Sequence, residues 1–183
     1  RLRVYLPVIQ EYLSDWSKGR FIDVGSGRGE WLDLLREKGA SDYVGVDLNA
    51  CQNAICEARG HKTVCMDCIR YLAKQPEVSV DLITGFQIIE HLCMSDLMEL
   101  LQQSYKVLKS GGMILFETPN PRNLNVGADT FFIDPSHKRP LPQELVEFFA
   151  EWSGFRQIRC IDANSHPHWP GVALVEENQP THE

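Results

Sequence analysis

The chain of 183 residues contains no long hydrophobic run. No apolar stretch approaches the roughly 20 residues that a membrane-spanning helix needs, and no signal peptide opens the sequence. We therefore predict no transmembrane segment. The sequence begins at Arg1 rather than at a methionine, so a fragment with its upstream segment missing is an open alternative. The length suits one domain with a sizeable core, over residues 1–183, and no repeat, low-complexity segment or linker divides it.

Positive charge is scarce, because 18 lysines and arginines face 25 aspartates and glutamates and the formal net charge is −7. This balance disfavours broad binding to nucleic acid, although a local basic patch stays compatible with it. Cys65 and Cys68 form a C-x-x-C, but no second pair and no paired histidines follow at zinc-finger spacing. The six cysteines are scattered through apolar segments, which predicts reduced core thiols and a cytoplasmic location.

A strand, a glycine-rich turn and a helix follow one another over residues 21–35. Ile22 and Val24 belong to an apolar run of the kind found in buried parallel strands. Three alternating glycines come next, at positions 25, 27 and 29, and an apolar helix face begins at Trp31. Glycines let a ligand approach the backbone, and free N–H groups at a helix start bind anions. The stretch predicts a cofactor-binding turn.

Strand and helix patterns then alternate along the chain. Strands are predicted at 43–47, 62–67, 78–83, 113–117, 155–161 and 172–175. Helices are predicted at 1–19 (a leading helix), 28–38, from 48 onward with Asn49 as the N-cap, 95–109 and 142–153. Repeated units of this length indicate a right-handed, doubly wound, mostly parallel sheet. The last of these helices is predicted to face inward with Leu145, Phe148, Phe149 and Trp152.

Three segments break the alternation. Residues 118–141 form a long loop, and a loop of this length inside a compact domain is usually functional or disordered. We predict that it lies on the acceptor side of the site. Residues 166–170 are predicted to form a tight turn and 176–183 a polar tail.

Acidic residues close two of the predicted strands. Asp47 follows the glycine turn by about 20 residues, where nucleotide-binding α/β folds carry a ribose-binding carboxylate. Asp67 closes the next strand and either binds the ligand or caps the helix after it. Because ligands of open α/β sheets lie at the carboxyl ends of the strands, we expect these acids near the glycine turn and near residues 85–91.

Two cofactor classes use a turn of this kind. The dinucleotide fingerprint places its third glycine three residues after the second, whereas the spacing here is G-x-G-x-G. Asp23 lies two residues ahead of the first glycine, where it would repel a pyrophosphate but would suit an ammonium group. The pattern D-x-G-x-G-x-G resembles motif I of the class I S-adenosylmethionine (SAM)-dependent methyltransferases.

The resemblance covers about residues 20–162. The segment V-D-L-I-T-G-F-Q-I-I-E-H-L resembles motif IV and K-S-G-G-M-I-L-F-E-T-P-N-P the motif V region. Within the superfamily, the chain is similar to the methyltransferase domain of bacterial O-antigen chain-terminating methyltransferase/kinase proteins. The narrower similarity lies in Gly29–Trp31, Glu117–Pro121, Asn123, Val126, Gly127 and the segment from Asp134 through His137 to Pro142.

The resemblance implies an α/β, Rossmann-like sheet of seven strands, mostly parallel with the last strand antiparallel, and helices on both faces. It implies SAM as cofactor and S-adenosylhomocysteine (SAH) as product. Gly25 and Gly27 would line the methionine part of SAM, and Asp23 would meet its amino group. Arg1 or Arg3 would reach its carboxylate from the leading helix.

The resemblance also assigns the rest of the cofactor site. Asp47 would hold the ribose hydroxyls, with Leu48 against the adenine. Asp67 would take the adenine amino group, with the backbone of Cys68–Ile69 beside it. Gln87 would lie next to the sulfonium.

For the acceptor, the resemblance implies a glycan or sugar phosphate in surface polysaccharide biosynthesis, and a fusion to or association with other polysaccharide-assembly domains. A hydroxyl acceptor needs a base, for which His91 and His137 are the candidates, whereas a phosphate is already anionic. For His91, the alternative to a catalytic base is a hydrogen-bonded structural histidine at the start of a helix. His137 lies beside Lys138 and Arg139 in the sequence, with Arg122 close by, and this basic cluster indicates either an anionic acceptor or an ordinary solvated loop.

A metal-assisted alternative stays open, although no metal is expected. Gln87-Ile88-Ile89-Glu90-His91, with His137 downstream, resembles the E-x-x-E-H…H metal site of small-RNA 3′-end methyltransferases, with Gln87 in place of the first acid. Glu90, His91 and His137 would still offer three ligands to one divalent ion. The rivals are thus a metal-assisted RNA 3′-end or small-molecule O-methyltransferase, an NAD-binding oxidoreductase, and an inactive SAM-binding module.

Overall fold

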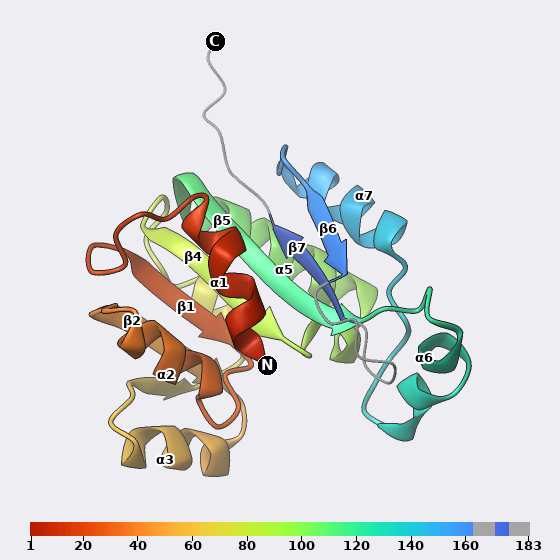
Figure 1. The fold of residues 1–183 in the computed structure, drawn as a ribbon, viewed down its shortest axis with the longest axis horizontal. Helices are drawn as coiled ribbons and strands as arrows, with labels where there is room; N and C mark the ends of the chain where they lie inside the picture. The colour runs from red at the N-terminus through yellow and green to blue at the C-terminus, as the bar shows by residue number, and fades with distance from the viewer. Residues whose placement is uncertain (163–170, 176–183) are drawn as a thin grey trace.

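The computed structural model describes residues 1–162 and 171–175. One mixed sheet runs through it, with helices on both faces (Figure 1). The strands are β1 (Arg20–Val24), β2 (Asp42–Asp47), β3 (Thr63–Cys65), β4 (Val80–Phe86), β5 (Leu108–Pro119), β6 (Arg159–Asp162) and β7 (Gly171–Val175). The helices are η1 (Leu2–Tyr5), α1 (Leu6–Gln10), α2 (Glu30–Glu37), α3 (Ala50–Ala58), α4 (Cys68–Leu72), η2 (Ile89–His91), α5 (Met94–Val107), α6 (Leu124–Ala128), η3 (Thr130–Ile133) and α7 (Gln143–Ser153). The predicted doubly wound α/β architecture is confirmed.

The sheet has the strand order β3-β2-β1-β4-β5-β7-β6. The first five of these strands are parallel, and β7 pairs antiparallel with both β5 and β6. The strand order changes direction between β1 and β4. These two strands are parallel neighbours, with Asp23 opposite Thr84, so their carboxyl ends lie at the same edge of the sheet. A ligand of such a sheet binds at that edge, beside the reversal. The glycine turn after β1 is placed there.

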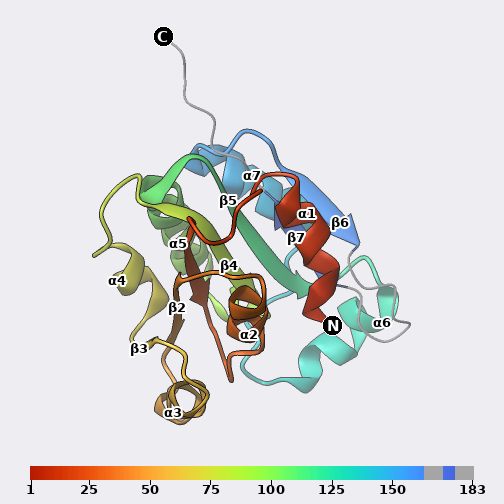
Figure 2. The same cartoon turned by 60° about the vertical axis from the view of Figure 1, so that its left-hand side comes forward.

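Side chains alternate along the central strands and form two apolar layers. Ile22 faces a layer completed by α4, α5 and α7, whereas its neighbour Phe21 faces a layer completed by η1, α1, α2 and α3. Figure 2 shows α1 and α2 on the near side of the sheet and α5 and α7 on the far side. Strands covered on both faces are apolar throughout, which explains why residues 21–24 carry one acid among three apolar side chains.

The leading helix is shorter than the prediction of 1–19. Helical structure ends at Gln10, and residues 11–19 form turns and irregular chain. Asp15 supplies the reason, because its Oδ1 accepts hydrogen bonds from the backbone N–H and the hydroxyl of Ser17 at 3.0 and 2.6 Å. Such local side-chain bonds to the backbone compete with helix. Trp16 is still buried, but it reaches the core from a turn.

The predicted inner face of α7 is partly wrong. Phe148 and Trp152 are 58% and 55% exposed, whereas Val146 and Ala150 are buried. Both faces of α7 carry aromatic or aliphatic residues, so apolar spacing alone could not tell which one packs on α5. The stretch from Phe155 also differs, because strand β6 begins only at Arg159 and Phe155 is a core residue.

The cysteines are free, as predicted, but they do not all belong to the core. Cys56 and Cys68 are buried and Cys160 is half-buried, whereas Cys51, Cys65 and Cys93 are exposed. The core prediction is therefore wrong for these three.

The predicted loop at 118–141 contains two short helices, α6 and η3. The Asn123 side chain accepts hydrogen bonds from the backbone N–H groups of Asn125 and Val126, which fixes the start of α6. The end of the loop is tied to η2, because the Lys138 N–H donates to the Glu90 carbonyl at 2.8 Å. The predicted turn at 166–170 and tail at 176–183 lie outside the described residues. Within the described part of the chain, no helix combines the length and the apolar character needed to cross a membrane.

Candidate active site

A cavity of about 510 Å³ opens at the carboxyl end of β1. Predicted site residues that line it are Arg1, Arg3, Asp23, Gly25 and Gly27. Other lining residues, which the sequence did not single out for the site, include Ser26, Glu30, Trp31 and Phe86. The Trp31 and Phe86 rings lie with centroids 5.0 Å apart, so the cavity has an aromatic wall on one side and a polar turn on the other.

The glycine turn requires glycine at two positions. Gly25 has φ of +68°, and a Cβ there would lie 2.7 Å from the Ile88 Cδ1 atom. Gly27 has φ of +53°, and a Cβ there would point into open space. A side chain would therefore clash at Gly25, and at Gly27 it would occupy space beside the backbone that a ligand can use.

Asp23 lies at the bottom of this cavity and is 2% exposed. Its Oδ1 accepts a hydrogen bond from the Thr84 hydroxyl at 2.7 Å. Burial raises the pKa of Asp23 to about 8, the Thr84 bond opposes this effect, and the carboxylates of Asp47 and Glu30 add to it. A buried carboxylate without a cation nearby is costly, so the position suits a ligand that brings a positive charge.

Asp47 holds the glycine turn from the end of β2. Its Oδ2 accepts the Gly27 N–H at 2.9 Å and its Oδ1 accepts the Asn49 N–H at 2.8 Å. Asn49 caps α3, as its position in the sequence indicated. Leu48, between them, is 71% exposed. The carboxylate and the leucine thus lie next to the turn, although they do not line the 510 Å³ cavity itself.

Asp67 caps α4, the structural role that the sequence left open. Its side chain accepts the Arg70 N–H at 2.9 Å. Cys68 is buried, and burial raises the pKa of its thiol to about 11, which leaves it unreactive. Ile69 is half-buried. These residues lie at the end of β3, one strand beyond Asp47, and they do not line the cavity.

Glu117 is a site residue that the sequence analysis did not assign. It is 1% exposed at the end of β5, and its carboxylate accepts hydrogen bonds from the Gln87 side chain at 2.7 Å, from the Tyr5 hydroxyl and from the Arg1 guanidinium. An acid at the end of a predicted strand, the signal that pointed to Asp47, could have found it. The network fastens η1 over the cavity.

Gln87 has a strained backbone, with φ of +57°. Its backbone N–H donates to the Glu117 carbonyl at 2.8 Å, and its side chain donates to the Glu117 carboxylate. Glu117 therefore holds Gln87 in this strained conformation through both bonds. Non-glycine residues in this region are concentrated at functional sites. Arg3, in contrast, forms two hydrogen bonds with the exposed Glu37, at 2.9 and 2.6 Å, on the outer side of the cavity.

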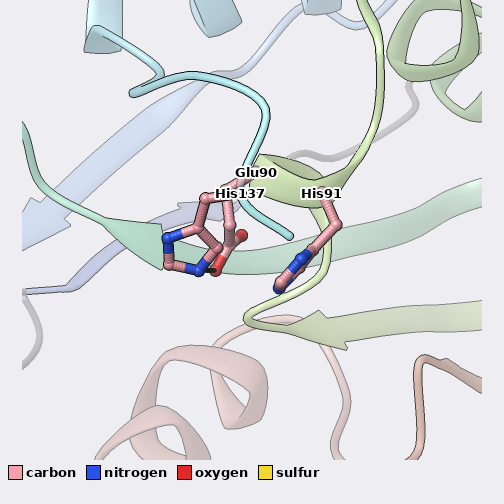
Figure 3. A group of neighbouring side chains, drawn as sticks. All are labelled: Glu90, His91 and His137. Atoms are coloured by element: carbon pink, nitrogen blue, oxygen red, sulfur yellow. Dashed lines mark ion pairs between the residues drawn. The ribbon is translucent and has the colours of Figure 1, made fainter. Parts of the chain in front are cut away.

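Glu90, His91 and His137 meet beyond the ends of β4 and β5. Figure 3 shows Glu90 and His91 coming from η2 and His137 from the loop after η3. The two imidazole rings have centroids 4.7 Å apart, and the His137 Nε2 atom lies 4.0 Å from the Glu90 Oε1 atom. The Thr118 hydroxyl donates to Glu90 Oε2 at 3.0 Å. Beyond the effect of burial, the charge of Glu117 adds to the raised pKa of Glu90, so this cluster lies within electrostatic reach of the Gln87–Glu117 network.

Burial sets the charge of the cluster. Glu90 is 0% exposed, and burial raises its pKa to about 7. Burial also lowers the pKa of His91, with the nearby His137 ring adding to this effect. A neutral imidazole can accept a proton or bind a metal ion, so the arrangement keeps His91 available for both.

The predicted basic cluster is smaller in the structure. Lys138 and Arg139 are exposed, and neither forms an ion pair with another described residue. Arg122 is paired with Glu144 on α7 and does not join them. Two cations therefore remain beside His137.

Comparison with known proteins defines the family. A family model described as a methyltransferase domain matches residues 1–170. The chain belongs to this family. A Mycolicibacterium smegmatis protein named "probable S-adenosylmethionine-dependent methyltransferase" is 30% identical over 149 residues, which make up 81% of this chain and 56% of that protein. The chain thus spans little more than half the length of this relative.

Solved methyltransferase structures share the fold. A SAM-dependent methyltransferase from Archaeoglobus fulgidus is 26% identical, with a TM-score of 0.79 over 97% of this chain and 95% of that one. A Haemonchus contortus phosphoethanolamine N-methyltransferase in complex with SAM has a TM-score of 0.73 at 15% identity, covering 97% of this chain and 53% of that one. The Rossmann-like methyltransferase fold is therefore confirmed, and the NAD-binding oxidoreductase is excluded.

The cofactor of this methyltransferase domain is SAM, and its residues suit that cofactor. The cavity offers a buried carboxylate at Asp23 for an ammonium group and open backbone at Gly27. The Asp47 carboxylate stands beside the turn, where a ribose can reach it. Exposed Leu48 provides an apolar surface for a flat ring.

Proposed function

We propose that this SAM-dependent methyltransferase domain methylates an oxygen of a glycan or sugar phosphate in surface polysaccharide biosynthesis. The observation that carries the proposal is the pairing of His91 and His137 beside the exposed cations Lys138 and Arg139, at the strand ends next to the cofactor cavity. A base and two cations at one edge of an acidic protein suit an acceptor that carries hydroxyls and a phosphate.

The cofactor residues act by positioning. We propose that Asp23 binds the amino group of SAM, that Arg1 or Arg3 binds its carboxylate, and that Gly25 and Gly27 line its methionine part. SAM, when bound, supplies a methyl group already activated on a sulfonium. Gln87, held in its strained conformation by Glu117, would then lie beside the reacting centre. The chain has to align the acceptor with this methyl group and exclude water.

We place the nucleoside along the edge of β2 and β3. Asp47 would accept hydrogen bonds from the ribose hydroxyls, and Leu48 would cover one face of the adenine. Asp67 would meet the adenine amino group beside the backbone of Cys68–Ile69. Asp67 keeps a second carboxylate oxygen for this bond, because its capping bond to Arg70 uses Oδ1 alone.

The acceptor side belongs to the two histidines. Each ring donates its Nδ1–H, His137 to the Phe131 carbonyl at 2.6 Å and His91 to the Ser136 hydroxyl at 2.9 Å. Each Nε2 atom is then free to take the proton of an acceptor hydroxyl. If the acceptor atom is a phosphate oxygen, no proton has to move, and Lys138 and Arg139 hold the charge.

The cellular setting forms part of the proposal. We propose a cytoplasmic location, which the free state of all six thiols supports, because disulfides form in oxidising compartments. The chain spans little more than half of its M. smegmatis relative, so fusion to or association with other polysaccharide-assembly domains is also proposed.

Labelled-methyl transfer from SAM to mannose oligosaccharides, with and without a terminal phosphate, tests the function. We expect transfer to at least one of the two. Arg139→Ala should reduce transfer to the phosphorylated glycan more than transfer to the free one, while SAH binding stays unchanged. His137→Ala should remove transfer to a hydroxyl. Arg156→Ala, on an exposed residue in the segment between α7 and β6, is the matched control. SAH binding without transfer to either glycan would refute the acceptor class.

The Glu90–His91–His137 cluster favours a second candidate, a metal-assisted RNA 3′-end or small-molecule O-methyltransferase. Repeating the assay with EDTA separates a histidine-base mechanism from a metal-assisted one, because base catalysis by histidine needs no ion. Loss of transfer with EDTA would favour the metal-assisted mechanism, and a short RNA as acceptor would then test the substrate.

A further inference from the structure

We propose that Glu90, His91 and His137 bind one divalent first-row transition-metal ion. The nearest ligand atoms of the three side chains lie within 4.8 Å of one another, and two of them, Glu90 Oε1 and His137 Nε2, are 4.0 Å apart. Ligands of one ion with bonds of about 2.0–2.2 Å lie roughly 3–4 Å apart. Small side-chain rotations therefore close the cluster onto an ion.

Hydrogen bonds fix both imidazole rings in the form that binds metal. The His137 Nδ1 atom lies 2.6 Å from the Phe131 carbonyl oxygen, which can only accept, so Nδ1 carries the proton. The His91 Nδ1 atom lies 2.9 Å from the Ser136 hydroxyl, whose own proton goes to Asp134 Oδ1 at 2.6 Å. His91 Nδ1 must then donate as well. In the neutral form of each ring, Nε2 therefore carries the lone pair.

One oxygen of Glu90 has no donor. Glu90 is 0% exposed; its Oε2 accepts the Thr118 hydroxyl, but its Oε1 accepts no hydrogen bond from any described residue. Buried polar atoms are almost always bonded, so an orphaned carboxylate oxygen calls for an explanation. This oxygen lies on the side of the His137 Nε2 atom, where a cation would satisfy it.

Each ligand also has the supporting bond that metal ligands usually have. Histidines on a metal donate their second N–H to a carbonyl or to a group linked to a carboxylate, and ligating carboxylates are themselves hydrogen-bonded. His137 uses a carbonyl, His91 reaches Asp134 through Ser136, and Glu90 uses Thr118.

The ligand set defines the class of ion. Two imidazoles and one carboxylate suit Zn²⁺, Mn²⁺, Fe²⁺ or Co²⁺ better than Mg²⁺ or Ca²⁺, which prefer oxygen ligands. Three protein ligands leave coordination positions open, as in catalytic rather than structural sites. His91 is half-buried, so an open position on its side of the ion would be reachable from solvent.

The use of the ion in methyl transfer rests on the proposed function, whereas its binding does not. An ion at this place would lower the pKa of an acceptor hydroxyl. The two histidines would then act as ligands, and no histidine base would be needed. Glu90 is close enough to Glu117 for their charges to interact, and Glu117 binds Arg1, which lines the cofactor cavity, so the acceptor would lie near that cavity.

Direct metal binding tests the proposal without any acceptor. The full chain is stripped with EDTA and titrated with Zn²⁺ by calorimetry and with Co²⁺ by visible absorption, in the presence of SAH. We expect one ion per chain. Glu90→Gln, which keeps the size of the side chain, and His137→Ala should each weaken binding by at least about 100-fold, and Ser136→Ala by about 10-fold.

Two controls keep the test decisive. Cys93→Ser removes an exposed thiol two residues from His91 and should leave the affinity unchanged, which excludes this cysteine as a ligand. SAH binding shows that each variant is folded, because none of the ligands lines the cofactor cavity. No saturable binding by the natural chain, or equal binding by Glu90→Gln, would overturn the proposal. Methyl transfer plays no part in this readout, so failure of the acceptor assay would leave the metal result standing.

Discussion

The Asp23→Asn variant tests whether the buried Asp23 carboxyl keeps its proton at neutral pH. Burial raises the pKa of Asp23 from an ordinary value of 3.8 to about 8 in the folded chain. The folded state thus keeps the proton over a range in which the unfolded state has lost it. The stability that this proton provides is complete below about pH 4 and is lost as the pH rises to about 8.

The size of the effect follows from the shift. Over that range the free energy of unfolding falls by about 1.4 kcal/mol per pH unit, or about 3 kcal/mol between pH 5 and pH 7. Asparagine has a similar shape, can still accept the Thr84 hydroxyl and carries no such proton. We expect urea unfolding without ligand to show that the natural chain loses about 3 kcal/mol more than Asp23→Asn over those two units. Parallel stability curves would mean that Asp23 is already ionised in the folded protein.

Cofactor binding should expose the same proton. If Asp23 meets the amino group of SAH, it must be ionised in the complex, so binding at pH 7 should release roughly nine-tenths of a proton. Calorimetry in buffers of different ionisation enthalpy measures this number. Asp23→Asn should bind SAH more weakly and lack this release, whereas equal proton counts for both proteins would refute the assignment of Asp23.

Four further substitutions test other parts of the molecule. Asp47→Ala should weaken SAH binding by about 3 kcal/mol, roughly 100-fold, because charge-assisted bonds to the ribose are lost; an unchanged Kd would refute the ribose assignment. Glu117→Ala should lower the free energy of unfolding by about 2 kcal/mol, since Tyr5 and its other donors lose their acceptor, and urea unfolding that shows no change would contradict the network. Trp152→Ser should change the free energy of unfolding by no more than about 0.5 kcal/mol, while Phe155→Ala should lower it by about 3–5 kcal/mol in the same assay. The reverse order would contradict the exposure of Trp152 and the burial of Phe155.

The local patterns of the sequence predicted the elements well where one signal dominated. The glycine turn, the Asn49 cap and the strands around it depend on neighbours in the chain, and the structure has them in place. The prediction of the leading helix is wrong beyond Gln10, because the Asp15 side chain accepts a hydrogen bond from the Ser17 N–H and so competes with helical bonding of the backbone. On α7 the failure has another cause, because apolar side chains lie on more than one face.

The site was predictable in part. Asp23, Gly25 and Gly27 line the cavity because they belong to one continuous stretch. The sequence could not decide whether Asp67 binds the ligand or caps a helix, because its capping bond to Arg70 depends on the geometry of α4. Glu117 was missed because its partners Arg1 and Tyr5 are more than 110 positions away.

The sequence by itself determined the order of strands and helices, the cofactor turn and the acids that follow the strands, since each depends on side-chain chemistry and spacing within a few residues. Only the tertiary structure decided which polar groups share a partner. Glu90 and His137 are 47 positions apart, and folding leaves one carboxylate oxygen without a donor opposite an imidazole whose proton is held elsewhere. The resemblance to a metal site already grouped Glu90 with His137, but their distance and hydrogen bonds depend on the packing of η2 against a distant loop, which no pattern of neighbouring residues encodes.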